Sequence, residues 1–164
     1  MANILRLNNG KVVEVHYFAP ERTDTLTLTI PAGSLSASQT IDTFTFNIDS
    51  PNNIVYFSGD IVFTAQVTTG ALTYNVVFRI LRDTTPILEN PPILVTIVAA
   101  THEIIFSDID EPGFNQCDYE REVTYSIVAT ATSTTIAPVA DEIITFALPP
   151  ELYPASILAA EIQI

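Results

Sequence analysis

The sequence predicts an all-β chain that folds as a single-domain β-sandwich of the jelly-roll type. Three observations lead to this prediction: apolar and polar residues alternate through most of the chain, turn-forming residues separate these stretches at short intervals, and helical spacing is nowhere sustained. A chain of 164 residues can build one domain with a substantial core and is too short for two ordinary ones. An immunoglobulin-like sandwich is the second choice. It is less favoured because that fold usually has a buried Trp packed against a disulfide between its sheets, whereas this chain has no Trp and a single Cys.

Five stretches alternate with a period of two, which is typical of strands with one dry face and one wet face. The side chains expected to face inward are Leu26, Leu28 and Ile30 in 24–30; Phe44, Phe46 and Ile48 in 42–48; Ile61, Phe63, Ala65 and Val67 in 60–69; Leu72, Tyr74, Val76, Phe78 and Ile80 in 72–82; and Val123, Tyr125, Ile127 and Ala129 in 122–131.

Three further stretches are expected to be strands. Residues 91–100 and 141–148 are apolar on both faces, which indicates strands covered on both sides or covered by another chain. Residues 155–164 alternate and are assigned as a strand rather than a short helix. Turn chemistry is found at 8–10, 31–33, 50–53, 58–60, 69–70 and 111–113, so about nine or ten short strands are expected.

The charge balance excludes several classes of partner. The net charge is −13, and the six basic residues are scattered along the chain as Arg6, Lys11, Arg22, Arg79, Arg82 and Arg121. Binding to nucleic acid depends on clustered Lys and Arg that neutralise phosphates, so no nucleic-acid partner is expected. Anionic membranes are disfavoured for the same reason. The most apolar stretch, 93–100, is far shorter than the ~20 residues that span a bilayer, so no membrane insertion is expected.

The single cysteine, Cys117, cannot close a disulfide within one chain, which suits folding in a reducing compartment. It is interpreted as a tolerated thiol, with a bond to a neighbouring chain as the open alternative. The start of the chain lacks the basic and apolar regions of a secretory signal, so synthesis without a signal peptide is expected.

Candidate chemical groups are few. Asp108, Asp110 and Glu111 cluster in an expected loop and are weak candidates for a calcium site, because hard cations take oxygen ligands. A solvated acidic loop is favoured, and no metal or cofactor is expected. Catalysis by Cys117 with His16 or His102 would require a Cys–His pair. His16 is expected on the polar face of its strand, alternating with Val15 and Tyr17, so the chain is predicted not to be an enzyme.

The two terminal runs read as strands without the lysines and prolines that usually protect a sheet edge. One hypothesis divides the chain into an arm, 1–18, that adds to a neighbouring copy, and a sandwich, 19–164. The residues that would fill an apolar groove of that neighbour are Leu5, Leu7, Val13, Val15 and Tyr17. The alternative is that both terminal runs pair within their own sandwich.

The stretch "IIFSDIDEPGFNQCDYEREVTYSIVATA" at 104–131 resembles small all-β proteins of spore-forming Firmicutes. In those proteins a Phe-bearing strand enters an Asp-rich turn with a cysteine, and a Tyr-Thr/Ser-Val/Ile strand follows. The stretch 54–83 is similar to the strand pair that they place upstream, and the likeness spans roughly 24–148. These families include spore-surface proteins and the jelly-roll subunits of endospore appendage fibres. Those subunits carry an N-terminal arm with cysteines, whereas residues 1–23 contain none.

The resemblance implies an extracellular protein of the cell or spore surface, released by lysis of a mother cell. We therefore expect a structural subunit that assembles with copies of itself into a fibre or surface layer through non-covalent strand addition. The alternative is a β-sandwich adhesin or ligand-binding module that forms a discrete oligomer, with or without calcium.

The first prediction concerns Cys117. If this residue is a tolerated thiol, Cys117→Ser should leave assembly unchanged, as measured by gel filtration and negative-stain microscopy with and without reductant. Dispersal of the assembly by the substitution, or by reductant alone, would indicate an intermolecular disulfide instead.

Overall fold

The computed structural model describes residues 11–18, 25–48, 50–112, 121–147 and 156–163. This part of the chain consists of strands, turns and loops, with no helix. The eleven strands found there are β1 (Lys11–Phe18), β2 (Thr25–Ile30), β3 (Ser36–Ile48), β4 (Ile54–Thr69), β5 (Tyr74–Arg82), β6 (Thr85–Glu89), β7 (Ile93–Val95), β8 (Ala100–Asp110), β9 (Arg121–Ser133), β10 (Glu142–Ala147) and β11 (Ser156–Gln163).

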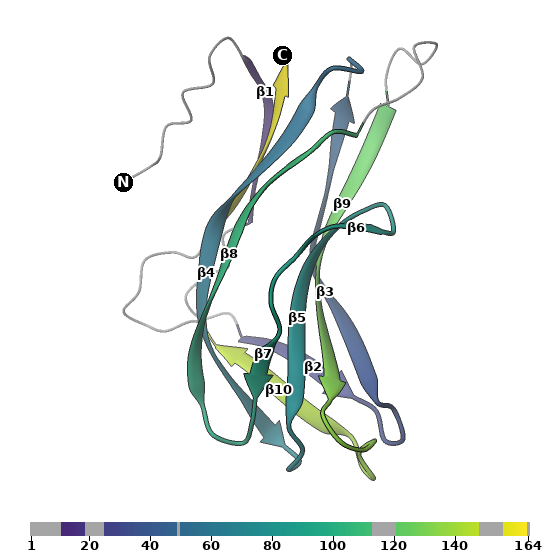
Figure 1. Cartoon of the computed structure of the whole chain (residues 1–164), viewed down its shortest axis with the longest axis vertical. Helices are drawn as coiled ribbons and strands as arrows, with labels where there is room; N and C mark the ends of the chain where they lie inside the picture. The colour runs from purple at the N-terminus through teal and green to yellow at the C-terminus, as the bar shows by residue number, and fades with distance from the viewer. Residues whose placement is uncertain (1–10, 19–24, 49, 113–120, 148–155, 164) are drawn as a thin grey trace.

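The strands form two antiparallel sheets that pack face to face (Figure 1). In the first sheet, β4 pairs along one side with β8 and along its other side with β11 and then β10. Beyond these lie β1, which pairs with β11, and β2, which pairs with β10. The second sheet has the order β3-β9-β5, and β6 and β7 both pair with the free side of β5.

This order is that of a jelly roll. The chain leaves the first sheet between β2 and β3, and the pairs β1/β2, β6/β7 and β10/β11 each occupy one strand position. In chain order the eight positions are β1/β2, β3, β4, β5, β6/β7, β8, β9 and β10/β11. The spatial order of these positions is 1-8-3-6 in the first sheet and 2-7-4-5 in the second. These are the two four-stranded sheets of a double Greek key, so the predicted fold class is confirmed.

The core lies between the two sheets and is built from the alternating residues. All of the inward side chains predicted in 42–48, 60–69 and 122–131 are buried, as are Leu28 and Ile30 in β2 and the four from Tyr74 to Ile80 in β5. Leu26 and Leu72 are partly buried and pack against this core. At its centre the Tyr125 ring lies 5.3 Å from Phe57 and 5.7 Å from Phe44, distances at which aromatic pairs attract beyond their area burial.

Several of the predicted details are wrong. The loop expected to hold Asp108 and Asp110 is the last part of β8. The turn expected at 58–60 is the interior of β4, because Gly59 pairs with Ile157 on one side and with Phe106 on the other. The continuous strand expected over 91–100 is limited to β7 in its first half. Residues 96–99 form a loop instead, with Ile97 and Val98 exposed, because β5 offers pairing partners only as far as Val95.

A buried carboxylate joins the two sheets at the upper end of Figure 1. Asp110 lies at the end of β8 and accepts hydrogen bonds from Arg82 Nη1 on β5, at 2.9 and 3.0 Å, and from Tyr125 Oη on β9, at 2.7 Å. Its charge is therefore balanced by a guanidinium and stabilised by a phenol, which offsets the cost of burying it. Burial and the hydrogen bond to this carboxylate raise the pKa of Tyr125 above its usual value.

A second buried carboxylate holds the opposite end without a cation. Glu142, at the start of β10, accepts hydrogen bonds from the backbone N–H groups of Ala71 and Leu72, both at 3.2 Å, and from Tyr74 Oη at 3.0 Å. The loop between β4 and β5 passes close to it at Gly70, which has φ +112°, and a Cβ there would lie 2.2 Å from the Glu142 side chain. Burial, followed by the hydrogen bond and the charge of Glu142, raises the pKa of Tyr74 to about 12.

The second prediction follows from these tyrosines. Tyr74 has a pKa of about 12 in the folded chain and the ordinary tyrosine pKa of about 10 when unfolded, so between these pH values the folded state holds a proton that the unfolded state loses. The stabilisation should be complete below about pH 10 and be lost as the pH rises through 12. The free energy of unfolding should fall by up to about 1.4 kcal/mol per pH unit for each such tyrosine. Urea unfolding between pH 8 and 11.5 measures this slope. Tyr74→Phe should reduce it, and an unchanged slope in that variant would contradict the assignment.

Candidate assembly interface

The strand β1 lies at an edge of the first sheet. It pairs with β11 of its own chain, with Tyr17 opposite Leu158 and Val15 opposite Ala160. Within the described residues, no strand pairs with its other side. The hypothesis that 1–18 is exchanged between copies stays a prediction, and its residues Leu5 and Leu7 lie outside the described part of the chain.

The orientation of β1 differs from the expected one. His16 faces inward, where its ring stacks on Phe44 at 4.2 Å and its Nε2 lies 2.8 Å from Asp42 Oδ2 on β3. The neighbouring side chains of Val15 and Tyr17 therefore point outward. The prediction that His16 occupies the polar outer face is wrong, because a histidine at the rim of the sandwich can stack on the core and still bond to a carboxylate of the opposite sheet.

The outward residues of β1 continue into an apolar surface across the first sheet. A row of directly paired residues runs from Val15 through Ala160 and Tyr56 to Ile109, and so crosses four strands. Directly opposed residues of antiparallel strands share one face. We name as the outer apolar face the exposed members of this surface, which are Val12, Val15, Tyr17, Ile105 and Ile109.

A β-bulge shapes the start of this strand. The pairing register shifts between Val12 and Glu14, so that both Val12 and Val13 are exposed. A bulge adds one unpaired residue and twists the edge. The regular part of the edge therefore runs from Glu14 to Phe18.

The acidic candidates do not form a cation site. Asp110 is engaged by Arg82 and Tyr125, and Asp108 Oδ1 accepts a hydrogen bond at 2.8 Å from the backbone N–H of Ile109. Among the described residues, no three His, Cys, Asp or Glu side chains come together in a way that could hold a metal ion. The weak grouping of Asp108, Asp110 and Glu111 as calcium ligands is therefore not assembled by the fold.

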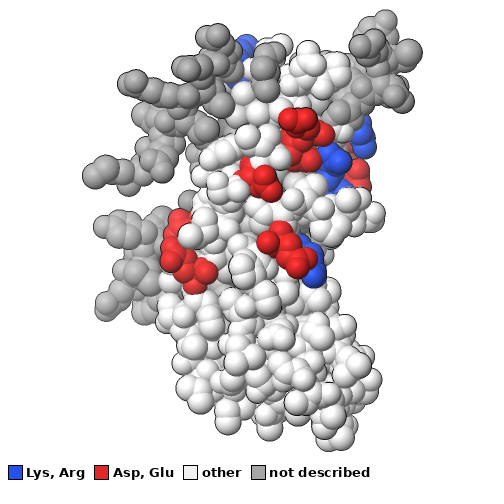
Figure 2. Space-filling model, viewed as in Figure 1, with Lys and Arg blue, Asp and Glu red and all other residues white. Residues whose placement is uncertain are grey.

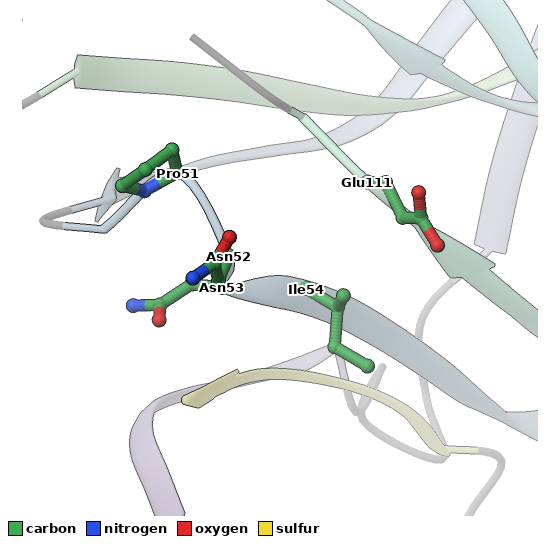
Figure 3. A pocket seen from close by; sticks show the side chains of 5 residues that line it. All are labelled: Pro51, Asn52, Asn53, Ile54 and Glu111. Atoms are coloured by element: carbon green, nitrogen blue, oxygen red, sulfur yellow. The ribbon is translucent and has the colours of Figure 1, made fainter. Parts of the chain in front are cut away.

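Glu111 instead lines a pocket of about 330 Å³ together with Pro51, Asn52, Asn53 and Ile54 (Figure 3). These residues come from the turn before β4 and from the end of β8. Beneath the turn, Asn53 Nδ2 donates a hydrogen bond of 2.6 Å to Glu161 Oε1, and both side chains are buried. That contact fixes the turn against β11, so it has a structural role.

The residues considered for catalysis are not brought together in the described part. Cys117 lies outside it, and His16 is bound to Asp42. His102 lies on β8 beside Phe63, with ring centroids 6.0 Å apart. Its Nε2 is buried and has no hydrogen-bond partner among the described residues. The expectation that the chain is not an enzyme stays a prediction.

No protein-family model and no curated protein matches this sequence. Solved structures with a similar arrangement of strands include three of infectious bursal disease virus. The Gx strain structure aligns with a TM-score of 0.44 at 8% identity, over 93% of this chain and 38% of that chain. The T13 viral particle aligns with a TM-score of 0.45 at 8% identity, over 91% of this chain and 37% of that chain. The VP2 subviral particle aligns with a TM-score of 0.40 at 9% identity, over 94% of this chain and 39% of that chain. This chain thus spans less than two fifths of each viral chain, and the likeness concerns the fold alone.

The described part of the chain contains no helix with the length and hydrophobicity that a membrane span requires.

The third prediction tests the orientation of β1. His16→Ala should lower the free energy of unfolding by about 1–2 kcal/mol, because it removes the contact with Asp42 and the stacking on Phe44. The matched control is Val15→Ala on the outward face of the same strand, for which we expect a change of about 0.5 kcal/mol or less. Urea unfolding of the two variants measures the difference. A larger loss for Val15→Ala would show that the two faces of β1 are reversed.

Proposed function

We propose that this protein is a structural subunit that assembles with copies of itself, through strand β1 and the outer apolar face, into a fibre or a layer on the cell or spore surface. The observation that carries the proposal is a sheet edge that no described strand covers, on a strand with exposed apolar side chains. Tyr17 on this strand, β1, is 65% exposed, and Ile105 on β8, in the same sheet, is 61% exposed. Both residues lie within strands rather than loops.

Strand edges of this kind offer unpaired backbone groups to another chain. Apolar side chains beside such an edge add affinity, because burying each contributes on the order of 1.5–3 kcal/mol before ordering costs. If each copy offers its edge to a different surface of the next copy, the contact need not close and the assembly grows. The resemblance of 104–131 to spore-surface and appendage proteins supports the proposed location.

The fourth prediction concerns this contact. Val15→Lys combined with Tyr17→Lys should disperse the assembly, because two desolvated ammonium groups oppose pairing at that edge. Thr84→Lys, in the exposed turn between β5 and β6, adds the same kind of charge elsewhere and is the control. Sedimentation velocity and negative-stain microscopy report the size of the assembly. Polymers formed by the double variant as readily as by the control would contradict the proposal.

Strand exchange is tested separately. Tyr17→Cys and Leu158→Cys place two thiols directly opposite each other, in a Cys117→Ser background. Treatment of the assembly with a short bismaleimide should link chains into a ladder if β1 is exchanged between copies. Linked single chains would show that β1 pairs within its own sandwich in the assembly as well.

A further inference from the structure

Four loops lie together at one end of the sandwich, the lower end of Figure 1. They connect β2 to β3, β4 to β5, β7 to β8 and β9 to β10. Their residues are 31–35, 70–73, 96–99 and 134–141, and of these only Asp141 is charged. We call this surface the loop end.

The loop end exposes large aliphatic side chains. Val139 is 98% exposed and Val98 is 69% exposed, and Leu35, Ile97 and Ile136 are exposed as well. Each of the loops β2–β3, β7–β8 and β9–β10 contributes at least one of them. A cluster of this kind at one end of a chain marks an interaction surface, because scattered single apolar residues are the norm elsewhere.

Hydrogen bonds between the loops hold the loop end together. The Gly33 N–H donates to the Pro138 carbonyl at 2.8 Å, which ties the β2–β3 loop to the β9–β10 loop. Thr134 N–H donates to the Thr73 carbonyl at 3.0 Å and so adds the β4–β5 loop. Two acidic residues also hold these loops. Asp141, the last residue of the β9–β10 loop, accepts a hydrogen bond from Ala32 N–H at 2.9 Å, and Glu142, the first residue of β10, holds the β4–β5 loop. Because the loops are already ordered, a partner that binds there incurs little ordering cost.

Most of the charged residues lie elsewhere. Asp, Glu, Lys and Arg are gathered over the upper and middle parts of the face in Figure 2, and the lower end of that face shows none. Since every copy carries a net charge of −13, two copies repel each other in most orientations. The repulsion is weaker when the copies meet through their loop ends, where Asp141 is the one charged loop residue, with the other acidic parts pointing away from each other.

We propose that the loop end is a second assembly contact, through which one copy binds the loop end of another. An apolar surface with a single charged residue can contact an identical surface, as an isologous two-fold contact requires. The inference rests on the proposed self-assembly and adds a contact distinct from β1, which lies at the opposite end of the sandwich (Figure 1).

The test uses Val139, whose side chain makes no packing contribution to the fold at 98% exposure. Val139→Asp and Val139→Lys should each weaken association of the full chain by about ten-fold or more, because each places a charge in the contact. A mixture of the two variants should associate again, because opposite charges then meet across the contact. Thr84→Asp is the control for the added charge, and sedimentation velocity over a concentration series gives the apparent dissociation constants.

The Val15→Lys/Tyr17→Lys background separates this contact from the one at β1. In this background the proposed contact through the loop end remains, so we expect a discrete dimer. Adding Val139→Asp to the same background should give a monomer. A monomer in the Val15→Lys/Tyr17→Lys background already overturns the loop-end contact while leaving the β1 contact intact. A persistent polymer in that background overturns the β1 contact instead.

Two further outcomes would overturn the proposal. One is a mixture of the Asp and Lys variants that associates no better than either alone. The other is co-sedimentation of the wild-type chain, and not of Val139→Asp, with zwitterionic phosphatidylcholine vesicles, which would assign the loop end to a lipid surface.

Discussion

The architecture of the first sheet depends on the pairing of one strand, β4. Its 16 residues are paired along one side with β8 and along the other with β11 and β10 in succession. Because the described strands that pair with β1 and β2 are β11 and β10 respectively, the backbone pairing of the first and last parts of the described chain runs through β4. Its inward side chains, from Val55 to Val67, also form much of the wall of the core. A disruption in β4 would therefore separate the sheet into pieces that could not fold alone.

The two ends of the sandwich are fixed by buried carboxylates of different kinds. Asp110 has a guanidinium partner in Arg82, whereas the hydrogen-bond donors that reach Glu142 from the described residues are two backbone N–H groups and the hydroxyl of Tyr74. Neutral donors stabilise a carboxylate in the same way when they are fixed in position. This arrangement requires a glycine at position 70, because its positive φ and its short distance from the Glu142 side chain leave no room for a Cβ.

The sequence is sufficient to predict the fold class and most of the core. The alternation of apolar and polar residues is a local signal, and each strand of a sandwich has one face buried in the core. It is insufficient where a partner strand decides the outcome. Ser58, Gly59 and Asp60 have the composition of a turn, but β8 and β11 pair with them on both sides and keep the strand extended. Residues 96–99 have the composition of a strand, but β5 begins at Tyr74, opposite Val95, and offers them no further pairing. The prediction of which face of β1 points inward is wrong for a similar reason. The contact of His16 with Asp42 joins residues that are 26 positions apart, so local alternation does not reveal it.

For the candidate interface, Val13, Val15 and Tyr17 can be identified from the sequence, because an apolar strand near a chain end is visible in it. The loop end cannot be found by periodicity, since its aliphatic residues are spread over loops that only the topology brings together. The signal available in the sequence is the low charge of 31–35, 70–73, 96–99 and 134–141, in which only Asp141 is charged. In a strongly acidic chain, four loops with one charged residue among them are unusual in composition, and a jelly roll places all four at the same end.

The acidic surface and the apolar surfaces have complementary effects on assembly. Two exposed apolar surfaces alone would allow copies to associate in many orientations, which leads to disordered aggregates. The charge of −13 penalises most of these orientations, because like charges that are forced together at an interface cost several kcal/mol. In the proposed assembly, the orientations with the least repulsion are those in which the loop end, with Asp141 as its one charged loop residue, faces another copy. Specific contacts would then form where the charge is lowest, while the charge elsewhere keeps the free subunit dispersed. High salt weakens this selection, because the screening length falls to about 3 Å at 1 M. We therefore expect the order of the proposed assembly to be more sensitive to salt than apolar contacts alone would make it.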